Sequence, residues 1–95
     1  MNAEDLMKLK SLVHQKSGIW ISEEYKHSSG EAIREFFFKK LNQKYYIGLD
    51  DYLLKYEDAT DLYFKYIREE FDDFTTATDY VINTIKIPEN KLIKK

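Results

Sequence analysis

Apolar positions in the first forty residues recur mostly at intervals of three and four, which is the spacing of one face of a helix. Asn2 precedes the first such run and can cap it, and Gly18 follows it as a stop signal. Ser22 can cap a second run, which Ser28–Gly30 either breaks or leaves continuous. We expect two helices here, the second with an apolar stripe formed by Ile33, Phe36, Phe37 and Leu41.

The second half of the chain shows the same helical spacing. Asp50 can cap a short helix, and Asp58 or Thr60 can cap a longer one that we expect to run to about Phe74. Thr76 can open a last helical segment, with an acidic residue three positions later as in a capping box. One proline and three glycines leave few helix breakers. We therefore predict an all-α fold, a small bundle of about five helices.

Three consecutive phenylalanines, Phe36, Phe37 and Phe38, stand in the second predicted helix. Successive helical residues are turned by about 100°, so the three rings cannot face one core. We expect at least one ring to be exposed, or to be buried by a second layer of the bundle or by a partner protein.

Composition narrows the class of protein. Hydrophobic residues make up 43% of the 95 residues, which suffices for one modest core. The net charge of −2 argues against nucleic-acid binding, and the absence of cysteine excludes disulfides and thiolate metal sites. No stretch reaches the length of a membrane span, and the N-terminus lacks the apolar run of a signal peptide. We expect a cytoplasmic chain.

Charge is distributed unevenly along the chain. Residues 50–79 hold 10 acidic and 3 basic side chains, whereas both flanking segments are weakly basic. Such a block is typical of a solvated helix face. A docking surface for a basic partner is the alternative.

Residues capable of catalysis do not form a recognisable site in the sequence. His14 and His27 are the only histidines, and neither has a second ligand at metal-binding spacing. The carboxylates of Glu69 to Asp73 suit a solvated face better than an acid–base pair. The three glycines are too far apart to form a nucleotide loop. We expect no catalytic residue, no metal and no cofactor, and no enzymatic activity of the chain on its own.

Three short motifs resemble the N-terminal domain of the chemoreceptor methyltransferases, the CheR family. Ser17-Gly18-Ile19 with Lys26 resembles a turn after that domain's first helix, Leu49–Leu53 resembles a short helix, and Phe74-Thr75-Thr76 resembles the hinge to the catalytic domain. The resemblance implies an all-helical domain over residues 1–83, with residues 84–95 as a C-terminal extension or tail. It also implies contact with receptor helices through a basic second helix.

The resemblance also indicates which side chains to inspect. Thr76, Asp79 and Asn83 stand at hinge positions that contact S-adenosylmethionine in the family, but Asp79 replaces a threonine and Asn83 an arginine. We therefore expect no cofactor at this degenerate hinge. The candidates for partner binding are Lys26, Arg34, Phe38, Lys39 and Lys40.

The leading hypothesis is a non-catalytic protein-binding or regulatory module, with a chemoreceptor or a methyltransferase domain as partner. One alternative is an N-terminal fragment of an S-adenosylmethionine-dependent protein-glutamate methyltransferase. Another is a self-associating helical module, a homodimer in which Phe38 lies at the interface. We expect no membrane partner, and DNA binding ranks last because basic residues are scattered.

Overall fold

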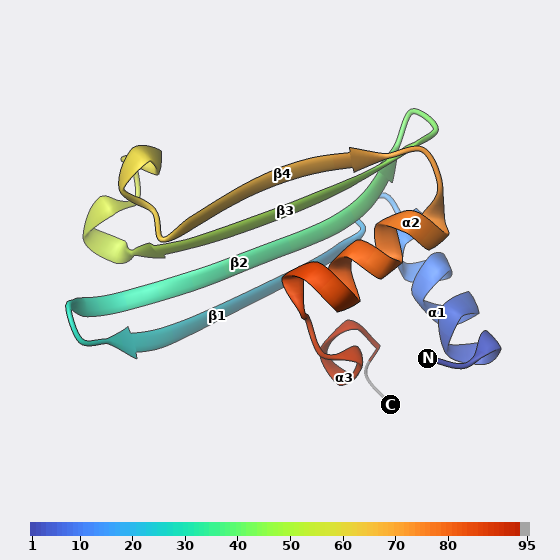
Figure 1. Ribbon diagram of the computed structural model, residues 1–95, viewed down its shortest axis with the longest axis horizontal. Helices are drawn as coiled ribbons and strands as arrows, with labels where there is room; N and C mark the ends of the chain where they lie inside the picture. The colour runs from blue at the N-terminus through green and yellow to red at the C-terminus, as the bar shows by residue number, and fades with distance from the viewer. Residues whose placement is uncertain (94–95) are drawn as a thin grey trace.

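The protein has an α+β fold in which an antiparallel sheet carries helices on one face (Figure 1). The computed structural model describes residues 1–93. The four strands lie side by side in chain order. They are β1 (Ile19–His27), β2 (Gly30–Leu41), β3 (Lys44–Leu53) and β4 (Lys65–Phe71).

Helical segments precede, interrupt and follow the sheet. Helix α1 comes first, two short 3₁₀ turns connect β3 to β4, and three segments follow the last strand, the middle one a π-helix. Their bounds are α1 (Ala3–His14), η1 (Leu54–Tyr56), η2 (Thr60–Leu62), α2 (Phe74–Asp79), η3 (Tyr80–Ile85) and α3 (Glu89–Leu92).

The prediction of an all-α bundle is wrong, because the central half of the chain forms strands. In β2, Phe36 and Phe38 point into the core and Phe37 points to the opposite face, as alternation along a strand requires. The supposed helical stripe therefore mixed residues from both faces of one strand. Helices were also expected within residues 50–74, where the structure has the end of β3, two 3₁₀ turns and β4.

Two tight loops set the register of the sheet. His27 pairs with Gly30 across the first loop, and Leu41 pairs with Lys44 across the second. The sequence left open whether a helix is broken or continuous at Ser28–Gly30, and the structure instead has a hairpin turn there, between β1 and β2. The second loop, formed by Asn42 and Gln43, has backbone φ angles of 52° and 71°, as a two-residue hairpin of the primed type needs.

Helix ends follow the predicted caps only in part. Asn2 caps α1, because its Oδ1 accepts a 2.8 Å hydrogen bond from the backbone N–H of Asp5. Thr76 is not a cap. Helix α2 begins two residues earlier, and Asp73 accepts hydrogen bonds from both the backbone N–H (2.8 Å) and the hydroxyl (2.9 Å) of Thr76.

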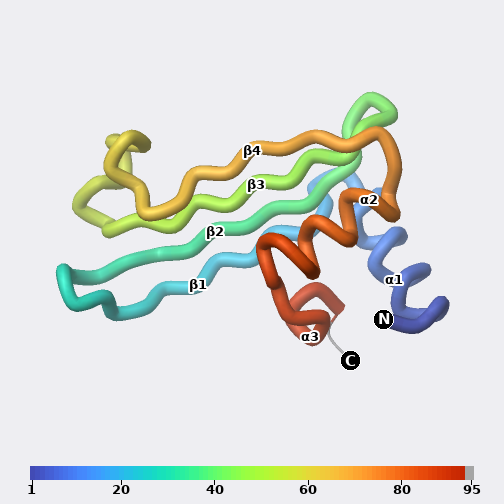
Figure 2. Tube along the Cα trace, viewed as in Figure 1, coloured from blue at the N-terminus to red at the C-terminus, as the bar shows by residue number. Residues whose placement is uncertain are grey.

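The core lies between one face of the sheet and the helices. Figure 2 shows α1 and the C-terminal segment gathered over one end of the sheet, while the β1–β2 hairpin extends beyond them. Part of the expected tail at 84–95 belongs to this core, since Leu92 and Ile93 are buried; Lys94 and Lys95 lie outside the described residues. The largest fully buried side chains are Leu9, Val13, Phe36, Phe38, Ile47 and Val81.

Candidate functional site

The face of the sheet away from the helices carries most of the exposed aromatic side chains of the strands, and we call it the open face. The pairing register aligns Trp20, Phe37, Gly48 and Arg68 in one row across all four strands. Trp20 is 59% exposed and Tyr66, on β4, is 53% exposed. The aromatic side chains of the open face are Trp20, Phe37, Tyr46, Tyr52 and Tyr66, and we include Tyr63, which stacks on Tyr52.

Phe37 lies at the centre of the row. Its ring centroid is 5.0 Å from that of Trp20, and its ring covers the backbone of Gly48. The Lys39 ammonium lies 5.1 Å and the Arg68 guanidinium 5.3 Å from the Phe37 ring. The aromatic row is therefore flanked by cations at distances suited to cation–π attraction.

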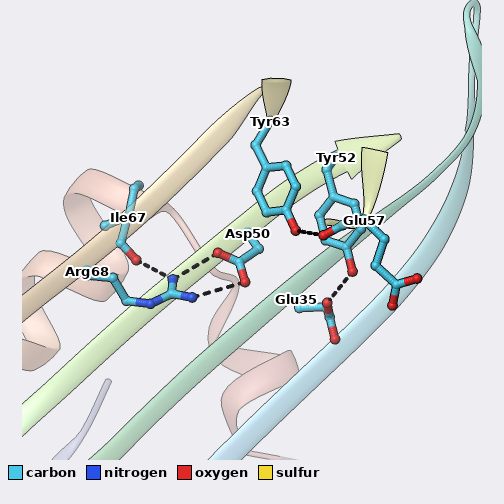
Figure 3. Close-up of polar contacts among 7 residues, drawn as sticks. All are labelled: Glu35, Asp50, Tyr52, Glu57, Tyr63, Ile67 and Arg68. Carbon is cyan, nitrogen blue, oxygen red and sulfur yellow. Dashed lines mark hydrogen bonds and ion pairs between the residues drawn. The ribbon is translucent and has the colours of Figure 1, made fainter. Parts of the chain in front are cut away.

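Arg68 is held in place by several contacts. Its two terminal nitrogens donate to the two carboxylate oxygens of Asp50 at 2.9 and 3.1 Å, and one of them also donates to the carbonyl of Ile67 (Figure 3). The guanidinium lies 4.4 Å from the Tyr66 ring. The hydrogen bonds to Asp50 raise the pKa of Arg68, so this side chain is a fixed cation.

Tyr52 and Tyr63 form a second rigid group beside the row. Their rings stack with a centroid distance of 4.2 Å. The Tyr52 hydroxyl donates to Glu35 at 2.7 Å, and the Tyr63 hydroxyl donates to the carbonyl of Glu57 at 2.5 Å (Figure 3). Burial raises the pKa of Tyr52, and the bond to Glu35 raises it further. Desolvation also raises the pKa of Tyr63, so both phenols stay neutral at physiological pH.

Charged side chains on the open face are largely paired with one another. Besides Arg68 with Asp50, Lys44 lies 3.4 Å from Glu70 and Lys26 lies 3.7 Å from Glu31. Such exposed pairs contribute little to stability. Because these charges are paired, the open face presents aromatic side chains surrounded by nearly equal numbers of positive and negative charges.

The five predicted partner-binding residues are divided between the two faces. The register places Lys26 and Lys39 on the open face, and Arg34 and Lys40 on the helix-covered face. Phe38 is fully buried in the core. A change of Phe38 to Asp would therefore test folding and not self-association.

Arg34 has a structural partner in the buried carboxylate of Asp51. Its Nη2 donates to Asp51 Oδ2 at 3.2 Å, and the Tyr25 hydroxyl donates to Oδ1 at 2.5 Å. The two donors satisfy the carboxylate, which is only 4% exposed. This cluster holds β1, β2 and β3 together.

The predicted hinge residues lie on the helical segments after β4, and the two histidines lie on α1 and at the end of β1. Asp79 and Asn83 are exposed on α2 and η3. His14 Nε2 lies 2.6 Å from the Tyr45 hydroxyl, and His27 Nδ1 accepts from a neighbouring backbone N–H. Within residues 1–93, no three acidic or histidine side chains are grouped closely enough to hold a metal ion. In the same residues, no helix is long and apolar enough to cross a membrane.

Comparisons with protein families, curated proteins and solved structures find no match to this chain. The segment Leu49–Leu53, which resembles a short helix in the CheR family, lies in strand β3. The all-helical fold that the resemblance implied is therefore not the fold of this protein.

The sequence analysis missed Trp20, Tyr66 and Arg68. Two of them flank Ile67 on β4, and Trp20 lies between two isoleucines on β1, so each is part of an alternation with a period of two. That alternation is typical of a half-buried strand. It would have placed all three on the face opposite the core.

Proposed function

We propose that this chain is a non-catalytic protein-binding module and that the open face is its binding surface. The observation that carries the proposal is the row of Trp20, Phe37 and Arg68, with Tyr66 beside it, left uncovered by any helix of residues 1–93. Tryptophan, tyrosine and arginine are the residues in which binding energy concentrates at protein interfaces. Aromatic residues and arginine are enriched at such interfaces, whose centres are depleted of charged residues.

Charge on the open face favours a protein partner over a nucleic acid. Nucleic-acid binding draws its affinity from unpaired cations that neutralise phosphates. Here Arg68 is held by Asp50, Lys44 by Glu70 and Lys26 by Glu31. The chain as a whole is also acidic.

Rigidity of the aromatic groups supports the same proposal. Phe37 is fixed against Gly48, the guanidinium of Arg68 by Asp50, and Tyr52 by stacking on Tyr63. Side chains that are ordered before binding lose less conformational entropy when a partner docks. Such a surface is preorganised for a flat partner.

The test is a differential affinity capture with three forms of the chain. The first is the natural sequence, the second carries Trp20→Ser and Tyr66→Ser, and the control carries Met7→Ser on α1, where Met7 is 74% exposed. We expect one set of proteins to be retained by the natural chain and by the control, and to be lost with the double variant. Calorimetry with the purified partner should then show a loss of affinity of about tenfold or more.

Two results would contradict the proposal. In the first, every specifically captured protein binds the double variant as well as the natural chain, although circular dichroism shows both forms folded. In the second, the Met7→Ser control loses the same proteins, which would locate the binding surface on the helices. Either result would show that the open face is not the binding surface.

A further inference from the structure

Strand β1 lies at the edge of the sheet, with β2 on one side and no strand of residues 1–93 on the other. The tight loop between His27 and Gly30 makes these two a hydrogen-bonded pair, and such pairs alternate along an antiparallel ladder. The odd-numbered residues of β1 therefore bond to β2. The backbone N–H and C=O groups of the even-numbered residues, Ser22 among them, point outward from the sheet.

A groove runs beside this free edge on the helix-covered face. It has a volume of about 910 Å³ and lies between α1, β1 and α3. Leu12, Ile19, Ile21 and Leu92 give it an apolar lining, and Ser11 lies on its α1 wall. A strand added to β1 would direct every second side chain into this groove, because side chains alternate between the two faces of a sheet.

The two edge strands of the sheet differ in how they are protected. Four of the seven residues of β4 are charged, which discourages the addition of another strand. The first four residues of β1, Ile19 to Ser22, carry no charge, and all four line the groove, together with Glu23. The unprotected segment and the apolar groove therefore coincide.

The side chains that line the groove carry a net positive charge. Glu23 and Lys91 lie 2.5 Å apart and neutralise each other. Lys8 lines the groove and has no ion-pair partner among the described residues. An acidic group on a molecule bound in the groove could therefore form an ion pair with Lys8.

We propose that β1 and this groove bind an extended peptide segment of another protein by strand addition. The peptide has apolar side chains at alternate positions and an acidic residue near Lys8. Peptides bound in this mode gain affinity from main-chain hydrogen bonds and specificity from alternate side chains. The site goes beyond the proposed open-face interface, and Trp20 is the aromatic residue of that interface that also lines the groove.

A second copy of the chain fits the edge less well than a peptide. Antiparallel pairing of two β1 strands over their full length would centre on Glu23 and bring the two Glu23 residues together. It would also place the uncharged first half of each strand against the half that contains Glu24 and Lys26. An unrelated peptide has neither conflict.

The first experiment selects random peptides displayed on phage against the full chain. We expect the enriched peptides to alternate apolar with other residues and to include an acidic residue. Each selected peptide is then synthesised in two N-methylated forms, one for each alternate set of backbone amides. Strand addition predicts a loss of about tenfold or more for one form and a change within about twofold for the other. Equal tolerance of both forms would overturn the proposal.

The second experiment changes the protein. Ser22→Pro removes an outward backbone donor without breaking a bond to β2, and Ser22→Ala is the matched control that keeps it. Ser11→Trp fills the groove and leaves the edge of β1 intact. This variant therefore still tests the proposal if the Ser22→Pro variant does not fold. Ser22→Pro and Ser11→Trp should each weaken the selected peptide by about tenfold, and Ser22→Ala by less than about twofold.

A third measurement separates this site from the open face and from self-association. Tyr66→Ser should leave peptide affinity unchanged, because Tyr66 lies on β4, across the sheet from the groove. Loss of the peptide with Tyr66→Ser would overturn the edge site. In sedimentation of the natural chain at high concentration we expect a monomer. If the natural chain is a dimer and Ser22→Pro dissociates it, then the edge of β1 binds a second copy of the chain. That result would overturn the proposal of a peptide ligand.

Discussion

The ring of Phe37 lies against the backbone of Gly48 on the neighbouring strand. A Cβ atom added at Gly48 would lie 2.1 Å from Cε2 of Phe37, far inside van der Waals contact. Only glycine therefore admits the ring in this position, and the ring in turn shields a strand backbone that has no side chain of its own. This contact fixes the centre of the proposed binding surface.

Replacing Gly48 by Ala should force the Phe37 ring away and destabilise the fold by about 1–3 kcal/mol, the usual cost of overpacking. Urea unfolding of the purified chain measures the change. In a Phe37→Ala background the clash is absent, so the same substitution should be neutral or stabilising. An equal cost in both backgrounds would show that the ring does not occupy this position.

Phe37 and Phe38 should respond differently to truncation. Phe38 is fully buried, so Phe38→Ala should cost about 3–5 kcal/mol of unfolding free energy. Phe37 is half-buried on the open face, and Phe37→Ala should cost less than Phe38→Ala. Equal losses in chemical denaturation would contradict the alternation of these rings between the two faces.

The buried carboxylate of Asp51 should matter more than an exposed one. Asp51→Asn weakens the bonds from Arg34 and Tyr25, and we expect a loss of about 1–3 kcal/mol in urea unfolding. The control is Glu31→Gln, which removes the exposed ion pair with Lys26 and should change stability by less than about 0.5 kcal/mol. A larger effect in the control would contradict the burial of Asp51.

His14 should make stability depend on pH. Slight desolvation of its ring, and then the charges of Lys40 and Lys10, lower its pKa below the ordinary 6.5. Because the folded state binds this proton more weakly than the unfolded state, stability should fall as the pH drops through 6.5 towards the folded-state pKa. The His14→Gln variant should lose less stability over this range. An NMR titration midpoint of His14 at or above 6.5 would be incompatible with this explanation.

Local signals in the sequence were sufficient to predict the first helix. Asn2 caps it, and of the three residues that recur there at helical spacing, Leu9 and Val13 are buried whereas Leu6 is 36% exposed. The sheet was missed because the apolar residues of β2 coincide with helical spacing, although they belong to two faces. Its hairpin loops, Ser28-Ser29 and Asn42-Gln43, also lack the Asn-Gly or Asp-Gly pairs that signal such turns most strongly.

The candidate surface was predictable only in part. Lys26 and Lys39 were among the predicted partner-binding residues and lie on the open face. Phe38 was chosen as a ring facing away from the core of a helical bundle, whereas in the strand it is its half-buried neighbour Phe37 that faces away from the core. The row across the sheet depends on strand register, which joins residues as distant in the chain as Trp20 and Arg68.

Hydroxyl-radical footprinting of the free chain and of its captured complex tests the open-face interface most directly. Trp20, Tyr66 and Met7 are all exposed and react readily, but Met7 lies on α1, on the other side of the sheet. We predict that the partner protects Trp20 and Tyr66 from oxidation and leaves Met7 unchanged. Protection of Met7, with Trp20 and Tyr66 as reactive as in the free chain, would contradict the account.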